Sequence, residues 1–308
     1  MKLLILVCLS CSVVFAQHAN YNTQKNWSLN KSEVVFTLGA TQFNGDLGGG
    51  VGVGKDYSMR DINWLSTGYQ FGLGLRKRFH PLLATTSNLK VFTLKGDDAL
   101  SMNAIRNARN LNFRSFNIQI EQKIEFIIAS NEKFSPSNFL LGNYPTRNKS
   151  QQLYVFSGVG LMYFSNQGYY NKPGEESKWV NLRKLKTEGV TYSPLTMTVP
   201  LGIGFRVGIS RTWRLGIEFS YNKTFSDYID DVSSVYVSPS SFNDPMAAYL
   251  SNPSDLSVTQ GNGFNWFGEG YQRGDSKQKD AFYHANFVLS KNITYKDYGI
   301  RRKKLLKK

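Results

Sequence analysis

The fold is decided by residues 195–232, LTMTVPLGIGFRVGISRTWRLGIEFSYNKTFSDYIDDV. In the first half, large apolar side chains occupy every second position, and small, polar or charged side chains fill the positions between them. After Ser210 and Arg211 the same alternation resumes at Trp213. Because successive side chains of a β-strand point to opposite faces, this pattern predicts two strands joined by a tight turn.

The length of these two runs separates a membrane strand from a soluble one. Each reaches the roughly 9–11 residues that a tilted strand needs to cross a bilayer, whereas strands of soluble proteins average about 5–6 residues. One face is apolar and the other is small or charged, which is typical of a barrel whose outside meets lipid. The stretch is therefore predicted to be a transmembrane hairpin.

Similar segments recur along the chain and predict eight strands. They are Glu33–Thr41, Gly68–Phe79, Leu82–Leu94, Ser115–Ile128, Gln152–Phe164, Leu195–Ile209, Trp213–Asn222 and Asp280–Tyr295. The third alternates poorly. The fourth alternates most regularly, with Phe and Ile on one face and Asn117, Gln119, Glu121, Lys123 and Glu125 on the other. A polar inner face indicates a barrel, because the inner faces of a β-sandwich are apolar.

The connections alternate in length, as they do in outer-membrane barrels with short periplasmic turns. They are short at His80-Pro81 and Ser210-Arg211, and long after the first, third, fifth and seventh strands. One connection, 130–150, departs from this rule because it should be short and is not. The expected fold class is all-β: an eight-stranded antiparallel transmembrane β-barrel over residues 32–297, with long extracellular loops, in the cell outer membrane.

The two ends of the sequence carry targeting and charge signals. Residues 1–16, MKLLILVCLSCSVVFA, predict a secretory signal peptide, with a lipoprotein signal at Cys11 as the alternative. A polar periplasmic segment is expected over 17–31, and a basic tail over 298–308. Both cysteines fall within the signal, so the mature chain is expected to have no disulfide or cysteine metal site. No run of 18 apolar residues follows the signal, which excludes transmembrane helices.

The charge of the chain points to anionic partners. The formal net charge of +15 suits lipid phosphates or an acidic protein, and export argues against nucleic acid. The basic tail RRKKLLKK, with Arg301, Arg302, Lys303 and Lys304, is either a solvated end or a docking arm on the periplasmic side. The expected partners are therefore outer-membrane lipid and an acidic periplasmic protein, with no nucleic acid.

Three patterns resemble chemical sites but have simpler interpretations. Residues Gly49–Lys55 approximate a phosphate-binding loop, but Asp56 stands where a hydroxyl residue should hold magnesium, so a surface loop is favoured. His284 could serve a lipid hydrolase, but no G-x-S-x-G elbow occurs, so a lumen or rim residue with ordinary hydrogen bonds is favoured. Asp227, Asp230 and Asp231 could bind calcium, but their spacing is not that of an EF-hand loop, so pairing with arginines and lysines of the loops or lumen is favoured. No catalytic, cofactor or metal site is predicted.

Three parts of the sequence resemble a known family. The segments VVFTLGATQFNGDLGG, TVPLGIGFRVGISRTWRLGIEFSYNKTFSDYIDDVSSVYV and FYHANFVLSKNITY resemble the PorG-like outer-membrane barrels of the Bacteroidota type IX secretion system. The resemblance is most specific at GDL (Gly45, Asp46, Leu47), at PLGIGF, and at DYIDDVSSVYV, which includes Asp227, Tyr228, Asp230 and Asp231. The loop sequence GYQRGDSKQKD is also similar. The extension RRKKLLKK and the long 130–150 connection depart from the family.

The resemblance implies a non-enzymatic component of a protein secretion apparatus that, in gliding members, also serves surface motility. Its barrel would be associated with periplasmic ring proteins, including a lipoprotein. DYIDDVS would then be a structural rim on the outer face. The alternative is a self-contained small barrel that binds or passes a small ligand. An eight-stranded barrel encloses a lumen only wide enough for side chains, so it is not expected to be a conduit for folded protein.

Overall fold

The computed structural model describes residues 31–47, 64–101, 103–130, 151–210, 212–255 and 266–293. Eight long strands form the body: β1 (Ser32–Asn44), β2 (Gly68–His80), β3 (Leu83–Asp97), β4 (Asn112–Ser130), β5 (Gln151–Tyr170), β7 (Leu195–Gly208), β8 (Trp213–Thr224) and β9 (Ala281–Asn292). A short strand, β6 (Lys178–Asn181), extends the sheet beside the end of β5. The small helices are η3 (Trp64–Ser66), η4 (Asp98–Leu100), α3 (Ala104–Arg109), α4 (Leu182–Leu185), η5 (Pro239–Ser241) and α5 (Pro245–Ser251).

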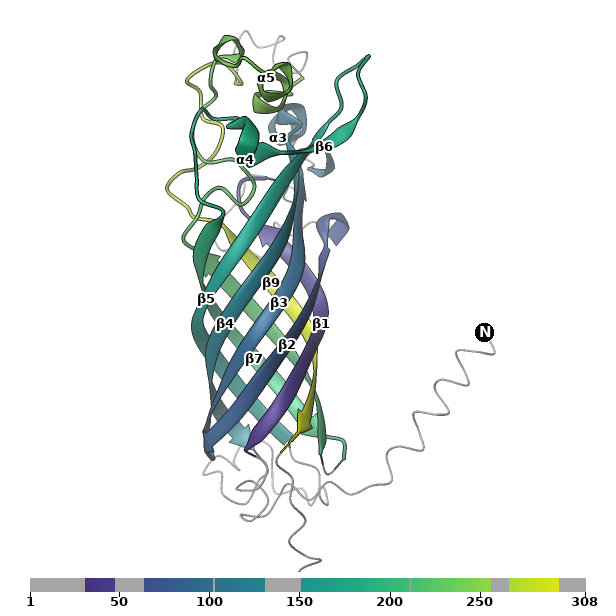
Figure 1. The fold of residues 1–308 in the computed structure, drawn as a ribbon, viewed down its shortest axis with the longest axis vertical. Coiled ribbons are helices and arrows are strands. Elements are labelled where there is room, and N and C mark those ends of the chain that lie inside the picture. Colours follow the sequence, from purple (N-terminus) through teal and green to yellow (C-terminus); the bar gives the residue numbers. More distant parts are fainter. Residues whose placement is uncertain are drawn as a thin grey trace, which may run out of the picture.

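The eight long strands close into an antiparallel barrel (Figure 1). Each pairs with its neighbour in the chain, apart from the inserted β6, and the pairing of β1 with β9 closes the circle. The predicted number and order of strands are confirmed. The strands β4 and β5 are longer than predicted, with 19 and 20 residues. The outer end of β4 pairs with β3 from Asn112 onward, and the outer end of β5 pairs with β6.

The strand faces follow the parity that the sequence predicts. In β2, Tyr69, Phe71, Leu73 and Leu75 are exposed, whereas the alternate residues are buried in the barrel. In β7, Leu201 is 62% exposed and Arg206 is 4% exposed. Apolar side chains thus cover the outside and polar ones fill the inside, the arrangement of a barrel in lipid.

The third predicted strand, which alternates poorly in sequence, is confirmed as β3 and alternates regularly in burial. Its inward residues, from Ala84 to Leu94, are buried at every second position. The outward face only looks irregular in sequence, because it carries Thr85 and Ser87. These two hydroxyls form hydrogen bonds with the exposed side chain of Gln122 on β4, which satisfies polar groups on the lipid-facing side.

Charged side chains bridge the lumen and fill it. Arg76 on β2 binds Glu125 on β4 (2.8 Å) and Glu33 on β1 (3.3 Å), and Arg206 on β7 also binds Glu125. A second bridge joins Lys123 on β4 to Glu218 on β8 at 2.6 Å. These side chains are nearly fully buried. The lumen is therefore packed with side chains across its width, as expected for eight strands.

The two ends of the barrel differ. The β2–β3 and β7–β8 turns lie at one end, together with Ser130 and Gln151, whereas α3, α4, α5 and β6 lie at the other (Figure 1). Because short turns face the periplasm in such barrels, the end with the helices is the outer end. Residues 131–150 and the two chain ends, 1–30 and 294–308, lie outside the described residues. None of the helices within the described ranges is long and apolar enough to cross a membrane.

Candidate functional site at the outer mouth

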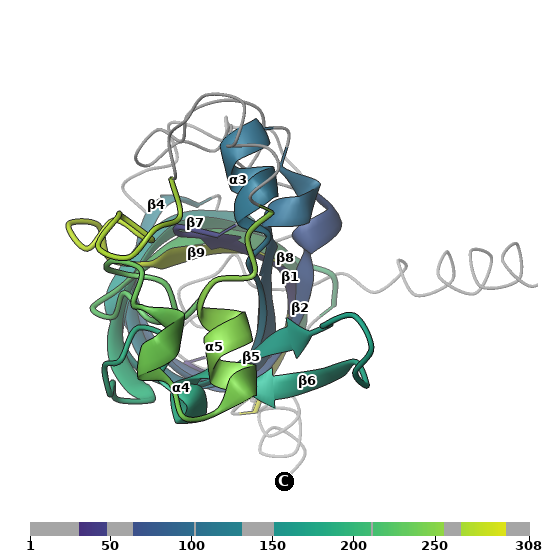
Figure 2. The same ribbon diagram turned by 90° about the horizontal axis from the view of Figure 1, so that it is seen from above.

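The segment Asp227–Ser234, here called the plug, fills the outer mouth of the barrel. Its Ile229 and Val232 are 0% and 1% exposed. They join a core built from the upper strand ends and the surrounding loops, which includes Phe43, Leu47, Phe92, Phe113, Phe164, Leu182, Leu250 and Phe282. Figure 2 looks down on this end and shows α4 and α5 over one side of the opening. The predicted rim is therefore packed into the mouth of the barrel, because two of its apolar side chains are buried in this core.

The GDL stretch that follows β1 is bound directly to the plug. The Leu47 amide donates to Asp230 Oδ2 at 3.1 Å, and the Val232 amide donates to Asp230 Oδ1 at 3.1 Å. Gly45 is needed because a Cβ there would lie 2.4 Å from both Asp280 Oδ1 and the Phe43 ring. Residues separated by 183 positions thus meet in one hydrogen-bonded unit.

Asp46 links the same unit to the loop before β9. Its Oδ2 accepts the amide of Asp275 at 2.8 Å, and its carbonyl accepts from Arg109 Nη2 at 2.6 Å. Arg109, on α3, is also paired with the buried Asp98 at 2.6 Å. The GDL stretch, α3 and the GYQRGD loop are therefore held together by Asp46 and Arg109.

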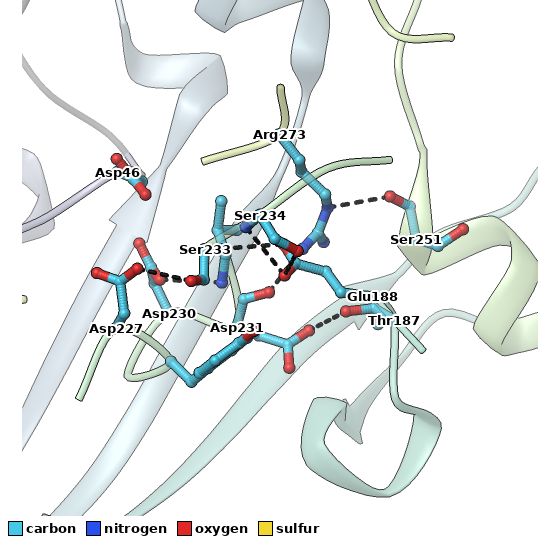
Figure 3. A network of polar contacts seen from close by, with 12 residues as sticks. Asp46, Thr187, Glu188, Asp227, Asp230, Asp231, Ser233, Ser234, Ser251 and Arg273 are labelled. Atoms are coloured by element: carbon cyan, nitrogen blue, oxygen red, sulfur yellow. Dashed lines mark hydrogen bonds and ion pairs between the residues drawn. The ribbon is translucent and has the colours of Figure 1, made fainter. Parts of the chain in front are cut away.

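Arg273, in the GYQRGD loop, is the cation that binds the plug (Figure 3). Its Nη1 donates to Glu188 Oε1 at 2.9 Å and to the Asp231 carbonyl at 2.6 Å, and its Nε donates to the Ser251 carbonyl at 3.2 Å. Glu188 also accepts the amides of Ser233 and Ser234 at 3.0 and 3.1 Å. Arg273 and Glu188 thereby join the plug to α5 and to the connection between β6 and β7.

Asp231 occupies a left-handed backbone conformation, with φ of 68°, at the tight bend of the plug. Its carboxylate accepts hydrogen bonds from the hydroxyls of Thr187 and Tyr192. Tyr192 stacks on Tyr228, with ring centroids 4.6 Å apart and planes 7° from parallel. Asp tolerates this backbone region better than most residues, which explains its place at the bend.

Four carboxylates gather at one side of the plug: Asp46, Asp227, Asp230 and Asp280. Burial raises the pKa of Asp46 to about 6. Burial also raises the pKa of Asp230 well above its ordinary value, and the neighbouring Asp280 and Asp46 reinforce that rise. The pKa of Asp280 is raised in the same way, by burial and then by Asp227 and Asp46. The closed plug therefore favours protonated carboxyl groups.

The calcium interpretation of Asp227, Asp230 and Asp231 does not match their contacts. Asp231 points toward Thr187 and Tyr192, whereas both oxygens of Asp230 accept backbone amides. Asp227 Oδ2 accepts from the Ser233 hydroxyl at 2.6 Å. Within the described ranges, no group of three or more His, Cys, Asp or Glu residues is arranged to hold a metal ion.

The other predicted positions lie away from the plug or outside the described residues. His284 lies buried in the lumen, where its ring contacts those of Phe92 and Phe282 at centroid distances of 4.9 and 5.0 Å. The expected lumen position is confirmed, but no described residue forms a hydrogen bond with either ring nitrogen. The loop Gly49–Lys55 and the residues Arg301, Arg302, Lys303 and Lys304 lie outside the described residues.

Sequence reasoning missed Arg273, Arg109 and Glu188. Arg273 stands within GYQRGD, a segment noted only for its similarity to the family. No local pattern marks Glu188, because its partners come from 45 and 85 residues further along the chain. A small cavity of about 260 Å³ lies beside this network, lined in part by Asn110, Asp230, Tyr249 and Arg273.

Comparisons with known proteins give only distant structural similarities. No protein-family model matches the chain, and no curated protein matches it. Three similar solved structures are the Neisserial surface protein NspA, the Yersinia pestis attachment invasion locus protein Ail, solved with the heparin analogue sucrose octasulfate, and the outer membrane enzyme PagL.

The alignments are long but weak. Identities are 7%, 9% and 11%, and TM-scores are 0.34, 0.32 and 0.30, respectively. They cover 86%, 85% and 85% of this chain and 97%, 97% and 99% of the other chains. Similarity at this level adds nothing to what the barrel itself shows. The closed eight-stranded sheet, its apolar outside and its polar lumen are the features of an outer-membrane β-barrel.

Proposed function

We propose that this protein is a non-enzymatic outer-membrane component of a type IX protein secretion apparatus, where it anchors or associates with periplasmic ring proteins that include a lipoprotein. The observation that carries the proposal is the plug. Gly45, Asp46 and Leu47 resemble the family at one place in the sequence, and Asp227, Tyr228, Asp230 and Asp231 at another. These positions meet in one buried unit, so the residues that carry the resemblance form a single tertiary structure in this protein.

The packed lumen favours a role in which the protein binds partners through its surfaces and does not act as a channel. The Arg76–Glu125–Arg206 group crosses the interior, and the plug occupies the outer mouth. Such a barrel can hold a partner at the membrane, but it offers substrates no open path. Participation in gliding motility is part of the same proposal.

The test is recovery of partners from membranes solubilised in mild detergent. Full-length tagged protein should retain periplasmic ring proteins, including a lipoprotein, and a variant lacking residues 298–308 should retain fewer if the basic tail is a docking arm. A matched control is the exposed outer-loop variant Lys172→Gln, which should retain them fully. If the full-length protein recovers no ring protein, the anchoring proposal is wrong.

The alternative is a self-contained barrel that binds a small ligand. The cavity of about 260 Å³ beside Arg273 favours this candidate over a pore, because it lies at the mouth and does not continue through the filled lumen. Planar-bilayer recordings separate the possibilities. Steady single-channel steps from wild-type protein would indicate a pore, and their absence together with recovered ring proteins supports anchoring.

A further inference from the structure

The outer rim of the barrel carries two cations side by side. Lys95 on β3 and Arg114 on β4 are paired directly across the two strands. Both side chains point outward and are exposed. Like charges placed directly opposite each other in a sheet destabilise it, since their Cβ atoms are only about 4.5–5.5 Å apart. An arrangement of this kind is stabilised by an anion that bridges both cations.

Neither cation is neutralised within the described part of the chain. Arg114 donates from Nε to the uncharged Gln167 Oε1 at 2.9 Å, and its guanidinium lies 4.0 Å from the centre of the Trp179 ring. Lys95 makes no ion pair with a described residue. The nearby carboxylate of Asp97 accepts the Ala99 amide at 3.0 Å, where it caps η4. The two cations thus have one carboxylate nearby, and that carboxylate already accepts a hydrogen bond.

The two cations line a cavity of about 500 Å³ with mixed walls. Leu65, Phe113, Tyr169 and Trp179 supply its apolar and aromatic sides, and Asn112 adds a polar group. Tyr169 and Trp179 pack with ring centroids 5.1 Å apart. The cavity therefore suits a ligand that is both anionic and partly apolar.

The height of the cavity on the barrel identifies the ligand class. Directly below Arg114, the outward residues of β4 are Phe116, Ile118 and Ile120, which are 49%, 40% and 65% exposed and face lipid. Beside the cavity, η3 exposes Trp64 by 81% and Leu65 by 78%. Aromatic side chains collect at membrane–water interfaces, and Lys and Arg there meet headgroup phosphates.

We infer that Lys95 and Arg114 form a binding site for the phosphate of a phosphorylated lipid in the outer leaflet. The phosphate bridges the ammonium and guanidinium groups, Trp179 holds the guanidinium in place, and the acyl chains lie along the apolar faces of β3 and β4. Arg recognises phosphate with parallel N–H donors, and Lys adds a point charge. The site does not depend on the proposed role in secretion.

The experiment measures lipid retention on delipidated full-length protein by native mass spectrometry, with bisphosphorylated lipid A as the probe. The variant Lys95→Gln/Arg114→Gln should bind about 10- to 30-fold more weakly, which is the loss expected for two cations near an anionic lipid surface. The control is Lys77→Gln/Lys291→Gln, which removes the same charge from outward residues near the other end of the barrel. Lys291 also lies over a tryptophan, 5.2 Å from the ring centre of Trp213.

The control should change binding less than twofold. Dephosphorylated lipid A should bind the wild type and the Lys95→Gln/Arg114→Gln variant equally weakly, and inorganic phosphate should not displace the lipid. Equal losses in both double variants would overturn the inference, because binding would then depend only on net charge. Full displacement by inorganic phosphate would also overturn it, in favour of a free-anion site. Heat-modifiable gel mobility verifies that each variant is a folded barrel.

Discussion

Replacing Arg273 with alanine should release the plug while leaving the barrel folded. Arg273 is 3% exposed and donates three hydrogen bonds, to Glu188, to the Asp231 carbonyl and to the Ser251 carbonyl. Removing one partner of a buried ion pair costs about 3–5 kcal/mol, because the other charge stays buried without compensation. Glu188 keeps its bonds from Ser233 and Ser234, so the lower end of that range is expected.

A loss of about 3 kcal/mol raises the open population of the plug by more than about 100-fold, since each 1.36 kcal/mol is a factor of ten. Hydrogen exchange at the Ser233 and Ser234 amides measures this opening, because both amides are bound only while Glu188 is in place. The strand amides of β4 should keep their protection, since their partners are β3 and β5.

Two further variants test the reasoning. Lys279→Ala removes the same charge from the same loop, but Lys279 is 45% exposed and lies 4.0 Å from Asp227. Exposed pairs contribute only about 0–1 kcal/mol, so exchange should hardly change. Adding Glu188→Gln to Arg273→Ala should restore protection at only one of the two amides, because no buried charge is then left unpaired but Gln has a single acceptor oxygen. Unchanged exchange in Arg273→Ala, or equal effects of Arg273→Ala and Lys279→Ala, would refute the assignment.

Three other predictions concern the plug, the lumen and the lipid face. Because burial raises the pKa of Asp46 from 3.8 to about 6, and raises that of Asp280, the closed plug is most stable below about pH 4 and loses stability as the pH rises through 6. The protection factor of the Val232 amide, corrected for the pH dependence of free-amide exchange, should therefore fall between pH 5 and 8, and fall less in Asp280→Asn. A protection factor that does not change with pH would contradict the role of the acidic cluster. Glu125→Ala removes the carboxylate that pairs with the buried Arg206 and one of the two carboxylates that pair with Arg76, and should cost about 3–5 kcal/mol in urea unfolding from lipid vesicles. Ile203→Arg places a charge on the lipid-facing side, at a residue that is 46% exposed, and should cost about 2–4 kcal/mol near the membrane midplane. Normal insertion of this variant would show that Ile203 faces the lumen and not the lipid.

The barrel could be predicted from the sequence because its strands obey a local rule. Parity within β2, β4 and β7 fixes which side chains meet lipid, and neighbouring strands in the chain are neighbours in the barrel. The irregular third strand marks where this rule weakens. From hydropathy alone, Thr85, Ser87 and Gln122 would not be expected on the lipid-facing side. Each of them forms a hydrogen bond with a side chain of the adjacent strand. Such lateral pairing depends on register, which a single strand does not reveal.

The plug could not be predicted in the same way, because its stability comes from contacts between distant parts of the chain. Asp230 alone suggests a metal ligand or an ion pair with an arginine or lysine of the loops or lumen. Only the Leu47 amide, 183 residues earlier, shows that its carboxylate is a structural acceptor. Arg273 and Glu188 are likewise ordinary loop charges until the fold buries them together.

The chemistry of the plug suggests why acidic residues stand where apolar ones would be more stable. The amides of Leu47, Ile229, Val232 and Asp275 would be buried without partners if Asp46, Asp230 and Asp280 were apolar. A buried amide without an acceptor costs about 1–3 kcal/mol, so carboxylates that accept several of them offset part of their own desolvation. The remaining repulsion among these carboxylates destabilises the plug and not the barrel wall. A structure built in this way keeps a rigid barrel in the membrane and concentrates its marginal stability at the outer mouth.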